Sequence, residues 1–479
     1  MPSQIDVAII GAGLSGIGAA YHLQDRCPEL SYTVFEGRAS MGGTWDLFRY
    51  PGIRSDSDMY TFGFSFHPWK SPKAIADGPS ILEYIKETAD KFNITEKIQF
   101  SHRVIKASWR SAEKRWILTV TSPEGESEIS CRFLISCTGY YNYEHGYEPE
   151  FPGRKNFKGP VIHPQKWPED LDYTNKKIII IGSGATAVTL VPELAKKAEK
   201  VYMLQRSPTY IMNLPREDAV ANFFKKVLPA KAAYGLSRWK NILISLGLYQ
   251  ASRKYPNAIR NFIKKQIRKT LGDRYRDEDF NPKYDPWDQR LCLVPDNDLF
   301  DALNSDKAEV VTDTIDQFTE NGIALQSGKE LEADIIVTAT GLEIQLFGGM
   351  KIDLDGKELI TSEVHAYRGV MFGGVPNLGV AIGYTNASWT LKCDLNCQFI
   401  ARVIRHMLDT DKEVVTPQFD ANRYETERLL DFDAGYVLRA ERILPKQGSK
   451  APWKVHQNYI KDLFSLKYTT VNDGHLEYR

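Results

Sequence analysis

The sequence has little cysteine and lacks long hydrophobic runs. Its six cysteines are scattered and form neither a short disulfide framework nor a CxxC metal spacing, which suits a reducing cytoplasm and predicts no metal site: Cys27, Cys131, Cys137, Cys292, Cys393 and Cys397. No uninterrupted apolar stretch reaches the length of about 18 residues that a bilayer-spanning helix needs. We therefore expect no membrane span.

The chain also lacks an excess of charge of either sign. Its 61 basic and 61 acidic residues give a net charge of +0, which favours small, neutral substrates over nucleic acid or an acidic partner. The first residues have no basic segment ahead of the apolar run that begins at Ile5, so we expect no cleaved signal peptide. At 479 residues, the chain is long enough for two or three domains.

What the sequence does contain is a strand, turn, helix and strand pattern that occurs twice. The first copy predicts a strand over Ile5 to Ile10, a helix to about Arg26 and a strand over Tyr32 to Glu36. Its turn reads GxGxxG and supplies candidate FAD-binding residues: Gly11, Gly13, Leu14, Ser15 and Gly16. The Glu36 carboxylate can accept from a ribose hydroxyl and would repel a 2′-phosphate, so this unit predicts FAD.

The second copy predicts a strand over Ile178 to Ile181, a helix to about Lys197 and a strand over Val201 to Gln205. Its GxGxxA turn supplies candidate cofactor-binding residues: Gly182, Ser183, Gly184, Ala185, Thr186 and Ala187. The last strand is followed by Arg206 and Ser207 instead of an acid. A guanidinium can pair with a 2′-phosphate, so this unit predicts NADPH rather than NADH, although an arginine at a strand end is often only a surface charge.

Two further predicted strands, Phe133 to Cys137 and Asp334 to Ala339, look like returns to these sheets. The fold class is therefore α/β, with two Rossmann-like dinucleotide-binding domains, for FAD and NADP, and a helical insertion. We predict an FAD-binding domain over residues 1–140 and 341–479, the latter including the C-terminal tail, an NADP-binding domain over 141–215 and 286–340, and the insertion over 216–285.

The stretch from Arg216 to Lys269 is rich in lysine and arginine, with apolar residues between them at loosely helical spacing. Pro229 and Pro256 are expected to divide it into short helices. One interpretation is a helical insertion with a solvated basic face, and the other is peripheral contact with an anionic membrane surface.

Two longer motifs carry a family resemblance. The residues from Phe157 to Pro168 read FxGxxxHxxxWP, which resembles the fingerprint of type I Baeyer–Villiger monooxygenases; related flavin-containing monooxygenases usually have tyrosine where Trp167 stands. The residues from Gly42 to Asp56 resemble the second motif of that family. The stretches Met41 to Trp69 and Tyr384 to Trp389 particularly resemble the ethionamide-activating branch.

The resemblance runs from the first strand to about Asn458. It implies an NADPH- and O2-dependent flavoprotein monooxygenase that converts ketones to esters or lactones through a C4a-peroxyflavin and also oxygenates the sulfur of thioethers or thioamides. In the family the fingerprint joins the nucleotide domains, so His163 and Trp167 would organise domain motion rather than touch substrate. From the residues alone, without the family resemblance, Phe157, His163 and Trp167 could be ordinary packing residues of a Pro-rich linker. Nothing in the sequence indicates an oligomeric state.

The resemblance also implies two catalytic residues, Arg290 and Asp56. Arg290 aligns with the family stretch that supplies a fixed cation beside the flavin, where negative charge develops on oxygen. Asp56 would pair with this arginine and orient it, and an ion pair with neighbouring Arg54 is the structural alternative. Gln289 stands where many family members have a lysine that grips the 2′-phosphate, so we expect weaker discrimination against NADH.

Other cofactor-binding residues follow from the same resemblance. Arg54 and Ser55 would line the nicotinamide side, and the backbone of Val104 would hold the adenine. The residues that would cover the flavin are Gly43, Thr44, Trp45, Asp46 and Leu47. The segment from Tyr384 to Trp389 is a candidate wall of the flavin site, and core packing explains its aromatics nearly as well.

The motifs admit three rival interpretations. A flavin-containing heteroatom monooxygenase shares both nucleotide units, and Trp167, Asp56 and Arg290 argue against it. A disulfide reductase would need a redox cysteine pair after the first unit, where only Cys27 is near. A non-catalytic NADPH-binding protein would tolerate loss of Arg290, and nothing in the sequence favours it.

Overall fold

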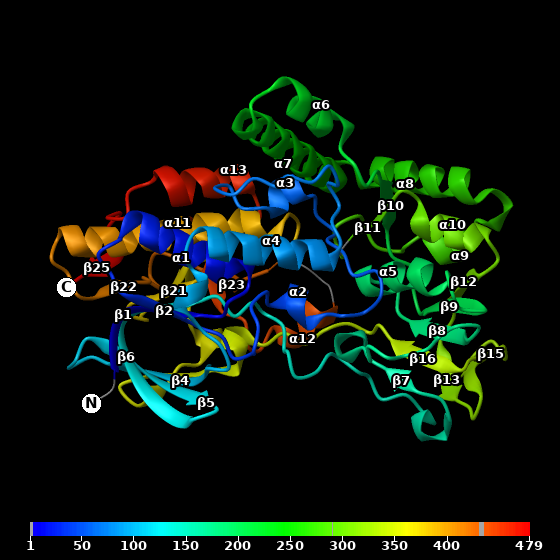
Figure 1. The fold of residues 1–479 in the computed structure, drawn as a ribbon, viewed down its shortest axis with the longest axis horizontal. Helices are drawn as coiled ribbons and strands as arrows, with labels where there is room; N and C mark the ends of the chain where they lie inside the picture. The colour runs from blue at the N-terminus through cyan, green and yellow to red at the C-terminus, as the bar shows by residue number, and fades with distance from the viewer. Residues whose placement is uncertain (1–2, 290, 431–434) are drawn as a thin grey trace.

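The computed structural model describes residues 3–289, 291–430 and 435–479. Two α/β halves lie side by side, each built around its own sheet (Figure 1). Within the described residues, nine strands form the sheet of the first half and five form the sheet of the second. The predicted fold class, α/β with two Rossmann-like units, is confirmed.

The first half is built on a parallel sheet with an antiparallel extension. Its strands are β1 (Ser3–Ile10), β2 (Tyr32–Phe35), β3 (Ile98–Gln99), β4 (Arg103–Arg110), β5 (Arg115–Ser122), β6 (Gly125–Ser136), β17 (Lys351–Leu354), β18 (Lys357–Glu358) and β21 (Leu378–Val380). β1 pairs in parallel with β2, with Val7 opposite Tyr32, and with β6, with Ile10 opposite Ser136. The last four residues of β1 are apolar and buried, as expected for a parallel strand covered on both faces.

Helices cover one face of this sheet (Figure 1): α1 (Leu14–Arg26), α4 (Gly78–Lys91) and α11 (Trp389–Asp409), with α1 packed against α11. Between α1 and α4 lie two short helices, α2 (Thr44–Leu47) and α3 (Met59–Phe62). The predicted end of the first helix at Arg26 is confirmed, and Glu36 directly follows β2.

The second half has an all-parallel sheet in the order β12 (Ala308–Thr312), β9 (Lys200–Gln205), β8 (Lys177–Ile181), β16 (Ile335–Thr338) and β7 (Val161–Ile162). Both predicted returns to the sheets are confirmed, because β6 pairs with β1 and β16 pairs with β8. The helix after β8 is α5 (Ala185–Leu194), so the predicted end near Lys197 is wrong by three residues. Beyond Leu194 the N–H groups of Lys196 and Lys197 donate to carbonyls three residues back instead of four, so the α-helical pattern gives way to a tighter turn.

The basic stretch between the halves of the second unit folds into three helices: α6 (Ala219–Val227), α7 (Ala230–Lys254) and α8 (Pro256–Leu271). Pro229 and Pro256 do separate them, but α7 has 25 residues, so the expectation of short helices is wrong for it. Each proline sits at a helix start, where its missing N–H costs nothing, and leaves the interior of α7 free of proline. The predicted domain boundaries stay predictions.

The remaining elements are short. Besides several 3₁₀ helices of three or four residues, the described chain has α9 (Asp277–Phe280), α10 (Asp298–Asn304), α12 (Gly435–Ala440), α13 (Tyr459–Asp462), η7 (Leu463–Tyr468), β10 (Ile211–Leu214), β11 (Cys292–Pro295), β13 (Ile315–Phe318), β14 (Gly322–Leu325), β15 (Glu330–Glu332), β19 (Ala366–Tyr367), β20 (Met371–Phe372), β22 (Val415–Pro417), β23 (Thr426–Arg428), β24 (Lys446–Gly448) and β25 (Leu476–Tyr478). Across the described ranges, none of the helices has the length and apolar character needed to cross a bilayer.

The chain crosses between the two halves twice, and the two crossings run side by side. Tyr141 on the outward crossing forms a bridge with Ile344 on the return crossing. Backbone hydrogen bonds extend this ribbon: the N–H of Asn142 donates to the carbonyl of Glu343 at 2.9 Å, and the N–H of Tyr147 donates to that of Gly341 at 3.0 Å. The two sheets are therefore joined by a paired linker rather than by two independent strands of chain.

Candidate active site

The first glycine loop forms a tight turn between β1 and α1. A Cβ placed on Gly16 would lie 1.9 Å from the carbonyl oxygen of Gly11, so no other residue fits there without moving the backbone. Gly13 stands at the N-cap of α1 and has no side chain to satisfy the first N–H groups of that helix. The helix N-terminus therefore offers unpaired N–H donors and partial positive charge to an anion.

Glu36, directly after β2, braces this loop from the side. Its carboxylate accepts from the N–H of Ala12 at 2.8 Å and from the N–H of Arg38 at 2.9 Å. Burial raises the pKa of Glu36 above its ordinary value, and the two backbone hydrogen bonds oppose that rise. Each carboxylate oxygen keeps a lone pair, so Glu36 can still accept from ribose hydroxyls.

A cavity of about 360 Å³ extends from Glu36 along the glycine loop to the start of α11. The structure brings eleven of the predicted residues together in its lining: Gly11, Gly13, Leu14, Ser15, Glu36, Gly43, Thr44, Trp45, Ser55, Asp56 and Val104. They come from the loop after β1, from α1, from the segment that follows β2 and from β4, which are far apart in the sequence. Four other predicted residues are not part of this lining within the described chain: Gly16, Asp46, Leu47 and Arg54.

Asp46 instead holds together the segment that carries Thr44 and Trp45. Its carboxylate is buried and pairs with Arg38 at 2.8 Å and with Arg49 at 2.9 Å. It also accepts from the hydroxyl of Ser40 at 2.5 Å. These contacts use the carboxylate for the shape of the loop.

Sequence reasoning missed several residues of the cavity wall. Tyr140, Tyr141 and Tyr143 line it, as do Gln345 and Phe347 on the return crossing. The tyrosines follow Thr138-Gly139 at the carboxyl end of β6, and ligands of open α/β sheets bind beyond such strand ends. The strand end before Thr138-Gly139 was therefore the available signal in the sequence.

An aromatic wall closes the cavity at α11. Tyr384, Ala387 and Trp389 all line it, as the resemblance suggested for this segment. The indole N–H of Trp389 donates to the hydroxyl of Ser15 at 3.1 Å, and its ring stacks on Tyr140 with centroids 4.8 Å apart. Trp389 is the first residue of α11, whose N-cap residue, Ser388, makes no side-chain capping bond to the described residues. The positive end of α11 therefore lies at the cavity.

The second glycine loop, Gly182 to Ala187, leads from β8 into α5 and lies outside this cavity lining as far as the chain is described. Arg206 and Ser207 follow β9 and are exposed, and the hydroxyl of Ser183 donates to the carbonyl of Ser207 at 3.2 Å. No carboxylate of the described residues lies within ion-pair distance of Arg206. Its guanidinium is therefore available to an external anion.

The loop from Tyr50 to Arg54 connects the first half to the second. Tyr50 and Thr186 share a side-chain hydrogen bond, and burial raises the pKa of Tyr50 to about 12. A Cβ on Gly52, which has a φ of +78°, would lie 2.2 Å from Cγ of Glu193 on α5. Arg54 pairs with Asp298 at the start of α10. The middle of the second motif is thus an interdomain contact, while its ends line the cavity.

The fingerprint residues act on the paired linker. Nε2 of His163 donates to the carbonyl of Gly341 at 3.1 Å, because its Nδ1 accepts from the N–H of Gln165 at 3.2 Å. The side-chain amide of Gln165 donates to the carbonyl of Asn142 at 2.8 Å, so both crossings are held. Trp167 is buried in the core of the second half. Neither His163 nor Trp167 lines the cavity in the described structure, in keeping with an organising role.

The structure describes only one of the two predicted catalytic residues. Asp56 lines the cavity. Arg290 lies outside the described residues. Its neighbour Gln289 is half-buried and forms a backbone bridge with Pro286.

A dinucleotide-type loop in each half, one long cavity and a loop that touches both halves define a nucleotide-dependent oxidoreductase with two cofactor-binding sheets. The model of the flavin-binding monooxygenase-like family matches residues 4–405 of the chain. The chain therefore belongs to this family and is a flavin-dependent monooxygenase, as its motifs predicted.

Similar proteins cover the whole chain. The FAD-containing monooxygenase EthA of Mycolicibacterium smegmatis is 52% identical over 480 residues, which span 100% of this chain and 98% of EthA. The probable FAD-binding monooxygenase AlmA of Acinetobacter baylyi is 49% identical over 481 residues, 100% of this chain and 97% of AlmA.

Solved structures agree in fold. An oxidized steroid monooxygenase bound to NADP has a TM-score of 0.74 at 25% identity and covers 87% of this chain and 88% of its own. A cyclohexanone monooxygenase with bound ε-caprolactone has a TM-score of 0.79 at 19% identity, with 100% of both chains covered.

Proposed function

We propose that the chain is an NADPH- and O2-dependent monooxygenase that converts ketones to esters or lactones and also oxygenates sulfur in thioethers or thioamides. The observation that carries the proposal is the segment from Gly43 to Asp56. It lines the cavity of the first half at both ends and contacts α5 of the second half in its middle. A group held by the second glycine loop and a group held in the cavity would meet at this segment.

FAD fits the cavity of the first half. Glu36 stands at one end with lone pairs for ribose hydroxyls, the open N-terminus of α1 would take the pyrophosphate, and the aromatic wall at Trp389 closes the other end. NADPH fits the second half, because Arg206 has no carboxylate of the described residues beside it and follows the strand next to the glycine loop. The similar proteins named for FAD and the similar structure bound to NADP support the same pair of cofactors.

Bound flavin supplies hydride acceptance from the nicotinamide and activation of O2. The chain supplies the surroundings. Tyr140, Tyr384 and Trp389 keep water from the reacting end of the cavity. The positive N-terminus of α11 stabilises negative charge that develops there.

We assign the fixed cation of the reaction to Arg290 and its orientation to Asp56, following the family motif. A guanidinium stays protonated at any pH at which the enzyme works, so it can stabilise an oxyanion without giving up its proton. A carboxylate in the cavity lining can hold such a cation in one direction by an ion pair.

The test is the conversion of 2-octanone by the purified yellow protein with NADPH and air, with products identified by gas chromatography and mass spectrometry. An ester supports the proposal. A thioether is then supplied in place of the ketone. Sulfoxide from the thioether without any ester from 2-octanone would show a heteroatom oxygenase instead. NADPH consumption that yields only H2O2 with both substrates would contradict oxygenation of either class.

Variants then test the assigned residues. Arg290→Ala should abolish ester formation while the flavin is still reduced by NADPH, and Arg290→Lys should retain a small part of the activity because it keeps the charge but not the planar fork. The matched control is Arg423→Ala, at an exposed position that does not line the cavity of the described chain, which should leave ester formation unchanged.

A further inference from the structure

One side of the protein carries a row of large apolar side chains that point into solvent. We define this apolar ridge by nine residues on α6, α7 and η7: Val220, Phe223, Val227, Leu236, Trp239, Leu243, Ile244, Phe464 and Tyr468. Their exposed fractions run from 43% for Trp239 to 64% for Tyr468. On each of α6 and α7 three of them follow the i, i+3, i+7 spacing of a single helix face. Both helices stand clear of the two sheets at the top of Figure 1.

The same region has a one-sided charge. From Ala219 to Gly272 the sequence has twelve basic residues and no acidic residue, in a chain whose totals are 61 and 61. Several of these cations pair with acids outside the segment. Among the described residues, five exposed lysines have no carboxylate within ion-pair distance: Lys226, Lys231, Lys254, Lys265 and Lys269.

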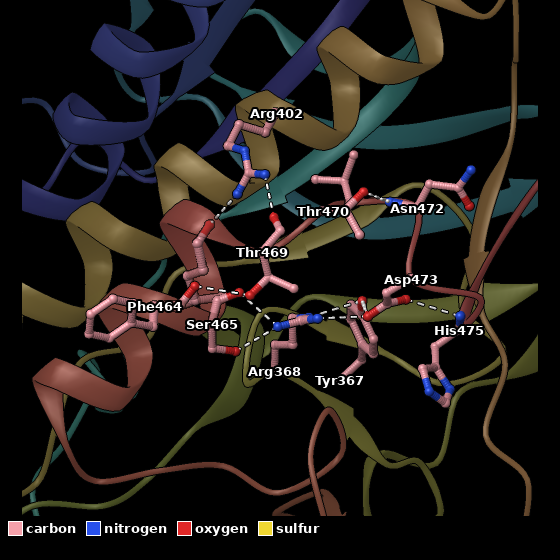
Figure 2. Close-up of polar contacts among 12 residues, drawn as sticks. Tyr367, Arg368, Arg402, Phe464, Ser465, Thr469, Thr470, Asn472, Asp473 and His475 are labelled. Atoms are coloured by element: carbon pink, nitrogen blue, oxygen red, sulfur yellow. Dashed lines mark hydrogen bonds and ion pairs between the residues drawn. The ribbon is translucent and has the colours of Figure 1, made fainter.

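The ridge is held rigidly. In α7, the guanidinium of Arg238 is buried and donates to the carbonyls of Tyr60 at 2.8 Å and Gly63 at 2.7 Å. Figure 2 shows how Arg368 fixes η7, by donating to the carbonyl of Ser465 at 2.7 Å. Arg402 on α11 donates to the carbonyl of Leu466 at 2.7 Å. Arg368 also pairs with Asp473 at 2.7 Å. Exposed apolar side chains on anchored backbone are a built surface rather than a frayed end.

We propose that the apolar ridge docks on the surface of an anionic lipid bilayer. Its apolar side chains would enter the level of the headgroups, and the unpaired lysines would meet the lipid phosphates, the two contributions that hold interfacial helices. A second copy of the chain fits less well. A two-fold symmetric contact sets the same surface against itself, which would place these cations against each other.

The position of α7 connects this surface to the flavin site. The helix α7 contributes Ile242, Ser245, Leu246 and Tyr249 to a small cavity that it shares with Ala387. Ala387 also lines the large cavity of the first half. One helix thus separates the bilayer from the reaction site, so an apolar substrate dissolved in lipid has a short path to it. The entry of substrate from lipid into the site rests on the proposed function, whereas docking on the bilayer does not.

The experiment is flotation of the full-length holoenzyme with vesicles of phosphatidylcholine alone and with vesicles that also contain phosphatidylglycerol. We expect binding to the anionic vesicles, and we expect added salt to weaken it because screening shortens the reach of the lysines. The triple variant Phe223→Ser, Trp239→Ser and Leu243→Ser should bind them at least about tenfold more weakly, given the apolar area removed. The double variant Lys226→Glu and Lys231→Glu should lose the preference for anionic lipid.

The matched control is Ile105→Ser, Ile360→Ser and Leu438→Ser, three exposed apolar residues on β4, near β18 and on α12, which should leave vesicle binding unchanged. Wild-type protein that stays with the soluble fraction, or a ridge variant that floats as well as wild type, would overturn the proposal. A wild-type protein that does not bind lipid but forms a dimer, and whose dimer the ridge substitutions dissociate, would also overturn the proposal. Vesicle binding needs no turnover, so its outcome is separate from that of the ketone assay.

Discussion

The two dinucleotide units share a local design and differ at one end. Each runs from a buried strand through a glycine turn into a helix, and each helix starts at a glycine N-cap. At the end of the next strand, the first unit has buried Glu36, whose carboxylate accepts two backbone N–H groups. The second unit has exposed Arg206, with no acid of the described chain beside it.

This difference teaches where specificity lies in such a unit. In the proposed function the turn and helix would bind a pyrophosphate in either case, because that contact uses backbone N–H groups. The residue after the second strand would lie at the ribose, and we expect its charge to decide whether a 2′-phosphate is repelled or paired. The comparison can be broken at the turn, at the strand end and at the linker.

The largest effect is expected at the third position of the turn. Gly16→Ala should destabilise the protein by about 3 kcal/mol and empty the flavin site, because the new Cβ would meet the carbonyl oxygen of Gly11 at 1.9 Å. Ala187→Gly in the second unit should cost only about 1 kcal/mol, the helix penalty of glycine. Thermal unfolding measures the loss of stability in each purified variant, and flavin absorbance measures the loss of bound flavin. Equal losses in the two variants would show that the two turns are not different.

The next effect is expected at the second strand end. Arg206→Ala should lower kcat/KM for NADPH by about 10- to 100-fold, the value of a charge-assisted hydrogen bond, and change kcat/KM for NADH little. Steady-state oxidation of the two cofactors measures the ratio. Exposed Arg110→Ala on β4 serves as the control, and an equal fall for both cofactors would remove Arg206 from 2′-phosphate recognition.

A smaller effect is expected at Gln289. Gln289→Lys should raise the preference for NADPH over NADH up to about fivefold, as expected for one added partly solvated cation near a phosphate. The same kcat/KM ratio measures it. An unchanged ratio would mean that Arg206 already provides all of the discrimination, and that the glutamine at this position does not weaken it.

The smallest effect is expected at the paired linker between the units. Burial lowers the pKa of His163 below its ordinary 6.5, so the folded state prefers the neutral ring that accepts from Gln165. Its contribution to stability is complete above pH 6.5 and is lost as the pH falls below it. His163→Gln, which cannot be protonated, should show a flatter dependence of Tm on pH. Parallel curves of Tm against pH for variant and wild type would exclude His163 as a source of the pH dependence.

Much of the fold could be predicted because the signals for its elements lie in contiguous residues. The strands at Ile5 and Ile178, the glycine turns and the opposite charges of Glu36 and Arg206 were all read from spacing and residue type. The predicted end of α5 was wrong because hydrogen bonds to carbonyls three residues back replace the α-helical ones after Leu194, and α7 was longer than expected because Pro229 and Pro256 stand at helix starts. Helix ends depend on a few local hydrogen bonds, which periodicity does not resolve.

The site was predictable only in part. The cavity gathers Ser15, Asp56 and Val104 as the motifs indicated, yet Asp46, which belongs to the same motif, turns its carboxylate to Arg38 and Arg49. Tyr140 follows the carboxyl end of β6, and this strand end was the only local signal that it could line a ligand site. Its role depends on stacking against Trp389, far along the chain.

The sequence by itself determined the α/β class, the two cofactor turns and the family, because these depend on local periodicity, glycine positions and motif spacing. Only the tertiary structure decided that one segment, Gly43 to Asp56, reaches both halves, and that His163 and Gln165 clamp both crossings. It alone also decided that the apolar residues of α6 and α7 face solvent instead of a core. Periodicity records that a face is apolar, but the partner that covers it is set by contacts between residues distant in the chain.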